Sequence, residues 1–263
     1  MKFIKINDCN IHYEITGSGT ETFLLAHGLL WSGKSYEKQV VHLKDRYRLV
    51  TYDHRGQGQS EVTETGYDMD SLYEDAVALI ENLHLGKVHF VGLSMGGFVG
   101  MRLAARRPDL VKSLILLDTS AETEPNKLKY NVLTTIVNLF GVKSVTSQVM
   151  DIMFSDTFLK DSNRKDELAK WTKELQNNPK SIVKAVRGVI DRKPIDNELN
   201  KIKCPTLIMV GTEDKATLPA RAEYIHSLIP QSELKLIDHG GHMSCIDEPE
   251  QVNSNIDSFL AKL

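Results

Sequence analysis

The sequence has few of the features that mark several large classes of protein. Its three cysteines, Cys9, Cys204 and Cys245, are odd in number and far apart, which predicts free thiols rather than disulfides or a zinc site. It has no apolar run of membrane-spanning length and no apolar block typical of a signal peptide near its start. The net charge of −3 shows no long run of one sign. We therefore expect a cytoplasmic protein that binds a small molecule, but neither nucleic acid nor a membrane.

Short apolar runs recur along the chain, with helical patterns between them. These runs are TFLLAHG, RLVTYD, KVHFVGLS, SLILLDTS, PTLIMVG and LKLIDHGGH. Because such strands lack clean alternation and are separated by helices, they predict an α/β fold: a mostly parallel sheet of about eight strands with helices on both faces. The N-terminal segment predicts an antiparallel hairpin at the edge of this sheet.

Two helix starts and one insertion complete the predicted organisation. Ser71 and Glu74 match a capping box, and Pro249 suits the first turn of a last helix. Helical patterns without a strand fill residues 121–196, after the sixth strand. We expect a helical cap there, which shapes a pocket, over a core formed by residues 1–120 and 197–263.

A serine interrupts the apolar run VHFVGLSMGGFVGMRLA. The segment Gly92-Leu93-Ser94-Met95-Gly96 fits G-x-S-x-G, in which a nucleophilic serine occupies a sharp turn from strand to helix. Glycines in such turns also occur for packing alone, but here a predicted strand precedes the pattern and a predicted helix follows it. We therefore predict that Ser94 is a nucleophile and that the Met95 N–H donates to an oxyanion.

A serine nucleophile needs a base, and that base needs an orienting acid. Of the two histidines after the last predicted strand, His242 is favoured over His239 because it lies in a glycine-loosened loop. Asp214 lies in a loop that follows the strand of LIMVGTED, and it is favoured over Glu213 in the same loop. Asp118, which ends another strand, is its main rival. The order Ser94, Asp214, His242 is the one expected on this architecture.

The loop AHGLLWSG can complete the site, because its Leu29 N–H could lie opposite that of Met95. We expect no metal and no organic cofactor. Candidates for an apolar substrate pocket are Trp31, Tyr130, Phe140, Met153, Phe154 and Trp171. An arginine such as Arg187 could bind a substrate carboxylate, although a solvated helix position explains it equally well.

Taken together, AHGLL, YDHRGQGQS, VGLSMGG, PTLIMVGTED and HGGH resemble the α/β-hydrolase superfamily over essentially the whole chain. The resemblance is to the branch that holds 3-oxoadipate enol-lactonases, small carboxylesterases and cofactor-free haloperoxidases or perhydrolases. It implies a Ser94, Asp214, His242 triad and an oxyanion hole formed by the Leu29 and Met95 amides. Perhydrolase-like members tend to carry proline where this chain has Leu30, which favours ester or lactone hydrolysis.

The resulting hypothesis is a serine hydrolase that cleaves a carboxylic ester or lactone through an acyl-serine, as a monomer or homodimer. Two alternatives remain at this point. One is a perhydrolase, haloperoxidase or lyase that uses the same Ser94, and the other is a ligand receptor of the same fold with slow turnover.

Overall fold

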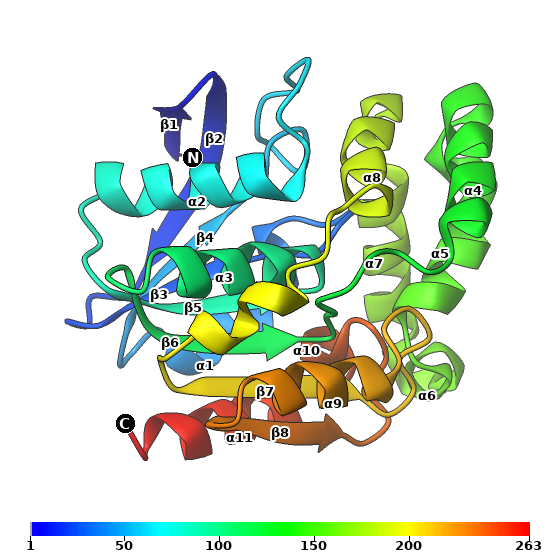
Figure 1. Cartoon of the computed structure of the whole chain (residues 1–263). Coiled ribbons are helices and arrows are strands. Elements are labelled where there is room, and N and C mark those ends of the chain that lie inside the picture. Colours follow the sequence, from blue (N-terminus) through cyan, green and yellow to red (C-terminus); the bar gives the residue numbers. More distant parts are fainter. Residues whose placement is uncertain (1) are drawn as a thin grey trace.

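The computed structural model describes residues 2–263 and contains one sheet of eight strands in the order β1-β2-β4-β3-β5-β6-β7-β8 (Figure 1). The first two strands run antiparallel to their neighbours, and the remaining pairs are parallel. The strands are β1 (Lys2–Ile6), β2 (Cys9–Thr16), β3 (Thr22–Ala26), β4 (Arg48–Tyr52), β5 (Val88–Leu93), β6 (Val111–Leu117), β7 (Thr206–Gly211) and β8 (Ser232–Ile237). This confirms the predicted sheet and its antiparallel N-terminal hairpin.

Helices cover both faces of the sheet. Helices α2, α3 and α9 pack on one face, and α1 and α11 pack on the other (Figure 1). Strands β3, β5 and β7 are buried along their whole length, which explains why their sequences read as continuous apolar runs. The helices that flank the sheet are α1 (Glu37–Leu43), α2 (Met69–Asn82), α3 (Met95–Arg106), α9 (Pro219–Leu228), α10 (Ser244–Asp247) and α11 (Pro249–Leu260).

The two predicted helix starts differ in outcome. Pro249 is the first residue of α11, as predicted. The capping box at Ser71 is wrong, because Asp68 caps α2 by accepting hydrogen bonds from the N–H groups of Asp70 and Ser71. The Ser71 hydroxyl instead donates to the Asp68 carboxylate at 2.7 Å. Asp68 therefore satisfies the first N–H groups of the helix, one turn before the predicted start.

A block of helices separates β6 from β7 and lies beyond the ends of the parallel strands (Figure 1). It contains α4 (Lys127–Phe140), α5 (Thr146–Met153), α6 (Asp156–Lys160), α7 (Lys165–Gln176) and α8 (Val183–Ile190), with short 3-10 turns between them. The strand ends that face this block are the place where ligands bind in open α/β sheets. The division of the chain into cap and core at residues 121 and 196 remains a prediction.

Candidate active site

The turn at Ser94 has an unusual backbone that close packing maintains. Ser94 separates β5 from α3 with φ 49° and ψ −108°, a conformation that costs free energy for a residue with a side chain. Its N–H donates to Leu117 O at 2.9 Å, and its carbonyl accepts from Thr119 Oγ1 at 2.8 Å. A Cβ on Gly96 would collide with the backbone oxygen of Ala26. The glycine is therefore needed so that α3 can start directly beneath β3.

The structure brings Ser94, His242 and Asp214 into one hydrogen-bonded series. His242 Nε2 lies 2.8 Å from Ser94 Oγ, and His242 Nδ1 lies 2.9 Å from Asp214 Oδ2. Burial alone would lower the pKa of His242, but the charge and hydrogen bond of Asp214 more than offset it and raise the pKa above 6.5. With its proton on Nδ1, the imidazole presents a bare Nε2 to the serine hydroxyl. This is the arrangement that a general base needs.

The carboxylate of Asp214 is fixed from several sides. Its Oδ1 accepts the N–H groups of Ala216 and Thr217 at 2.7 and 2.8 Å. Its Oδ2 accepts the hydroxyl of Thr217 at 2.7 Å in addition to the ring N–H of His242. Only 2% of the residue is exposed. The loop after β7 therefore holds the Asp214 carboxylate in one orientation.

The alternatives to Asp214 and His242 have other partners. Asp118 turns away from His242: its Oδ1 accepts from Gly211 N at 2.9 Å and its Oδ2 from the Ser244 hydroxyl at 2.6 Å. Burial raises the pKa of Asp118 to about 7, with a smaller contribution from the charge of Asp214. Glu213 binds Thr157, and His239 is exposed beside Glu213. Asp118 thus ties the end of β7 to the histidine loop without contacting the imidazole.

The loop after β3 is held by residues that the sequence analysis did not assign. His27 is fully buried; its Nδ1 donates to Gly28 O at 2.7 Å, and its Nε2 accepts from His54 N at 2.9 Å. Burial lowers the pKa of His27, which favours the neutral ring that this pattern requires. Leu30 has φ 75°, and its N–H donates to Gln57 Oε1 at 2.8 Å. Gln57 belongs to the segment YDHRGQGQS, in which no local pattern marks this glutamine as the partner of Leu30.

The two predicted oxyanion donors are the amides of Leu29, which lines the cavity, and Met95, which directly follows Ser94 in the chain. Leu29 lines the cavity with Ser94, and Met95 is the first residue of α3, where a backbone N–H has no partner within the helix. Neither amide donates to a protein acceptor outside regular helices and strands, as far as residues 2–263 are concerned. Both are free to bind a developing oxyanion. Their participation remains a prediction.

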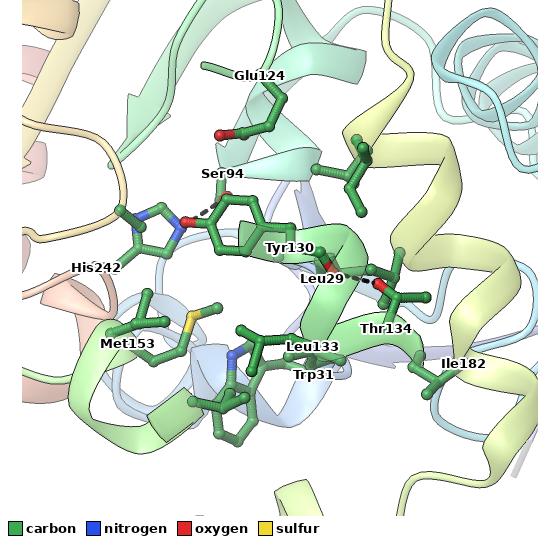
Figure 2. Close-up of a pocket in the computed structure, with 18 of the residues that line it drawn as sticks. Leu29, Trp31, Ser94, Glu124, Tyr130, Leu133, Thr134, Met153, Ile182 and His242 are labelled. Carbon is green, nitrogen blue, oxygen red and sulfur yellow. Dashed lines mark hydrogen bonds between the residues drawn. The ribbon is translucent and has the colours of Figure 1, made fainter. Parts of the chain in front are cut away.

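A cavity of about 130 Å³ opens beside Ser94 and His242, under α4, α5 and α8 (Figure 2). Trp31, Tyr130 and Met153 line it, and most of its remaining wall is aliphatic. An engineered void of roughly 150 Å³ holds a benzene molecule, so this cavity accommodates a small apolar group. The aliphatic wall is formed by Leu133, Val137, Val142, Val145, Val149, Ile152, Ile182, Val183, Val186, Val189 and Ile190.

Three of the predicted pocket residues do not line the cavity. Phe140 ends α4 and is 73% exposed. Phe154 and Trp171 are buried behind Trp31, each at 5.8 Å between ring centroids and nearly perpendicular to it. These expectations are wrong because aromatic character does not specify which side of a helix faces the cavity. The spacing of Tyr130, Leu133, Thr134 and Val137 along α4 does.

The arginine that reaches the cavity is Arg192 rather than Arg187, which is exposed on α8. Arg192 Nη1 donates to Glu124 Oε2 at 2.9 Å, and Glu124 also lines the cavity. The other guanidinium contacts are Glu122 O, Val189 O, Ser120 Oγ and the face of the Phe98 ring. Neither residue was predicted, because no local motif marks the pair. No group of three or more potential metal ligands occurs within residues 2–263.

Comparison with known proteins identifies the family. A family model described as the alpha/beta hydrolase fold matches residues 21–249. The chain belongs to this family. The match spans most of the molecule, including β3 to β8 and the residues around Ser94.

Relatives agree with this assignment. A 3-oxoadipate enol-lactonase of Acinetobacter baylyi is 29% identical over 231 residues, covering 87% of this chain and 84% of its own. A protein of Agrobacterium fabrum, provisionally named carbamate hydrolase RutD, is 29% identical over 259 residues, covering 95% and 98% of the two chains. A thermophilic esterase from Thermogutta terrifontis is 26% identical with a TM-score of 0.91, covering 100% and 99%. The protein is a hydrolase whose relatives include esterases and lactonases.

No helix within residues 2–263 is long and apolar enough to cross a membrane.

Proposed function

We propose that this protein hydrolyses carboxylic esters with a small, uncharged acyl group through an acyl-serine intermediate. The observation that carries the proposal is the series Asp214, His242, Ser94 with contacts of 2.9 and 2.8 Å. His242 takes the proton of Ser94 as its Oγ attacks the ester carbonyl. The amides of Leu29 and Met95 then stabilise the oxyanion.

The second half of the reaction uses the same groups in reverse. His242 gives its proton to the departing alcohol and leaves the acyl group on Ser94. A water molecule then attacks this ester while His242 accepts its proton. His242 returns that proton to Ser94 Oγ as the bond between Oγ and the acyl carbon breaks, and the acid is released. Throughout, Asp214 holds the imidazole in the Nδ1–H tautomer and stabilises its charged form.

The cavity supports a neutral acyl group. Its one lining arginine, Arg192, is already paired with Glu124, so a substrate carboxylate would find no free cation there. This argues against an enol-lactone that carries a carboxylate and for a simple ester, with neutral lactones as a second possible class. Leu30 supports hydrolysis over peracid chemistry, because proline cannot adopt φ 75° or donate the N–H that Gln57 accepts.

The test is hydrolysis of p-nitrophenyl esters with acyl chains of two to eight carbons, with neutral lactones and an enol-lactone that carries one carboxylate in parallel. We expect the highest kcat/KM with acyl chains of about four to six carbons, because the cavity is close to the size of one that holds benzene. Ser94→Ala should lower kcat by about 10⁶-fold. Ser227→Ala, the same change on the exposed side of α9, is the matched control.

Two results would reject the proposal. One is an absence of turnover with every ester and lactone while a fluorophosphonate fails to label Ser94, which would favour the receptor alternative. The other is peroxide-dependent halogenation faster than ester hydrolysis. Cytoplasmic location and a monomeric or homodimeric state remain predictions.

A further inference from the structure

Among the polar side chains of the cavity wall, Glu124 and Tyr130 lie on the side of the reacting groups (Figure 2). In Figure 2, Glu124 and Tyr130 lie on the side of Ser94 and His242, whereas Leu133 and Ile182 lie on the opposite side. The hydrolytic mechanism proposed above uses neither of them. An ester with one apolar part and one polar part would therefore match the cavity better than an ester that is apolar throughout.

Glu124 is a hydrogen-bond acceptor with spare capacity, and its ion pair with Arg192 has no net charge. Its Oε1 accepts from Asn126 N at 2.9 Å and its Oε2 from Arg192 at 2.9 Å. A carboxylate has about four lone-pair positions, so two remain for a ligand. Since Arg192 balances its charge, the site attracts neither a carboxylate nor an ammonium group. A neutral donor, such as a hydroxyl, is the group that suits it.

Tyr130 supplies the complementary donor. Its hydroxyl points toward His242 and Ser94 in Figure 2, and the side chain is half-buried in the cavity wall. Burial raises its pKa to about 12, with smaller contributions from the charges of Glu124 and Asp214. The phenol therefore keeps its proton at neutral pH. No hydrogen-bond partner of this hydroxyl contributes to that shift.

We propose that Glu124 and Tyr130 bind a hydroxyl group on the alcohol part of the substrate, so that the preferred substrates are monoesters of diols or polyols with a short apolar acid. This inference rests on the proposed ester hydrolysis. Glu124 accepts the hydroxyl proton, and Tyr130 donates to the hydroxyl oxygen. The alcohol part is specified because the departing oxygen must lie next to His242 Nε2, which protonates it.

The test compares two esters that differ by one group. In 2-hydroxyethyl butyrate the terminal hydroxyl replaces the terminal methyl of propyl butyrate. Two hydrogen bonds in a partly buried site predict a kcat/KM ratio of about tenfold or more for the wild-type protein. Propyl 3-hydroxybutyrate and propyl isovalerate differ in the same way in the acid part, and for this pair we expect a kcat/KM ratio near one.

Tyr130→Phe removes one oxygen atom and should reduce the 2-hydroxyethyl to propyl ratio to about threefold or less. Tyr224→Phe is the matched control and should keep the wild-type ratio, because Tyr224 is exposed, donates to Asp196 and does not line the cavity. Glu124→Gln should lower the ratio as well. Thermal melting of each variant shows whether the fold is retained.

The outcomes separate this inference from the function beneath it. If p-nitrophenyl butyrate and both alkyl esters are inert, ester hydrolysis itself fails. If both alkyl esters are cleaved equally well by the wild-type protein, the hydrolase stands and the hydroxyl subsite is wrong. A preference for the 3-hydroxy acid, or a ratio that Tyr130→Phe leaves unchanged, would likewise overturn the assignment.

Discussion

Replacing Asp214 by asparagine should reverse the tautomer of His242. The Asp214 Oδ1 position faces two N–H donors, from Ala216 and Thr217, at 2.7 and 2.8 Å, so the amide oxygen of asparagine must occupy it. The amide nitrogen then takes the Oδ2 position, 2.9 Å from His242 Nδ1, and donates to it. The ring proton moves to Nε2 and points at Ser94. A ring in this state cannot accept the serine proton.

The expected loss is about 10⁴-fold in kcat, or about 5.5 kcal/mol in the activation free energy. The assay is p-nitrophenyl butyrate hydrolysis at saturating substrate, with a melting curve to show that the variant is folded. Glu213→Gln is the matched control, since Glu213 is next in the same loop but binds Thr157, and it should change kcat less than about twofold. An Asp214→Asn variant within tenfold of wild type would refute the reasoning. A larger loss in Asp118→Asn would make Asp118 the orienting acid.

Three further predictions concern pH and packing. The acid limb of the kcat/KM profile should have its midpoint above pH 6.5, because Asp214 raises the pKa of His242 and only the neutral ring is a base; a midpoint below 6 in a pH series would contradict this. Gly96→Ala should destabilise the fold by about 1–3 kcal/mol or more and reduce Ser94 labelling, as measured by urea unfolding and a fluorophosphonate, because its Cβ would meet the Ala26 oxygen. Burial raises the pKa of Asp247 from 3.8 to about 7, so ionisation of this carboxyl destabilises the fold as the pH rises from 4 to 7. The free energy of unfolding of Asp247→Asn should therefore rise relative to that of the wild type by on the order of 4 kcal/mol over this range. A difference between the two proteins that does not change with pH would refute this prediction.

The sheet and the hydrogen-bonded series of Ser94, His242 and Asp214 were predictable, because both depend on local sequence pattern and chain order. Buried parallel strands read as short apolar runs, and their carboxyl ends meet at one edge, so the residues after β5, β7 and β8 converge there. Ser94, Asp214 and His242 occupy those three positions. The glycines around Ser94 add a backbone constraint that is visible directly in the sequence.

The choice between Asp214 and Asp118 needed the structure. Both follow a strand, and the sequence favours Asp214 only by the order expected on this architecture. The backbone decides their orientation: Asp118 has φ 47°, and its carboxylate binds Gly211 and Ser244. The Ser244 contact joins segments 126 residues apart in the chain. No local pattern encodes a contact of that kind.

The residues that line the cavity were predicted less well, because contacts between helices rather than local sequence patterns determine them. Aromatic residues in the helical segment could pack inward, pack behind another ring or face solvent, and Tyr130, Trp171 and Phe140 do each of these in turn. Which one occurs depends on how α4, α7 and α8 pack together, and that is set by contacts between helices rather than within them. The Glu124–Arg192 pair is more distant still, since its members are 68 residues apart.

The Glu124–Arg192 pair also shows how substrate specificity can change while Ser94, His242 and Asp214 stay the same. Ser94, Asp214 and His242 follow strands of the sheet, whereas Glu124 and Arg192 belong to the segment between β6 and β7. An unpaired arginine at position 192 would turn a neutral pocket into one that attracts carboxylates, and Glu124 is the residue that prevents it. Glu124→Ala should therefore shift preference from a neutral ester such as propyl butyrate toward 2-carboxyethyl butyrate, in which a carboxylate replaces the terminal methyl group of the alcohol part. A variant that loses neutral-ester activity without any gain on the anionic ester would show that the pair only braces the pocket wall.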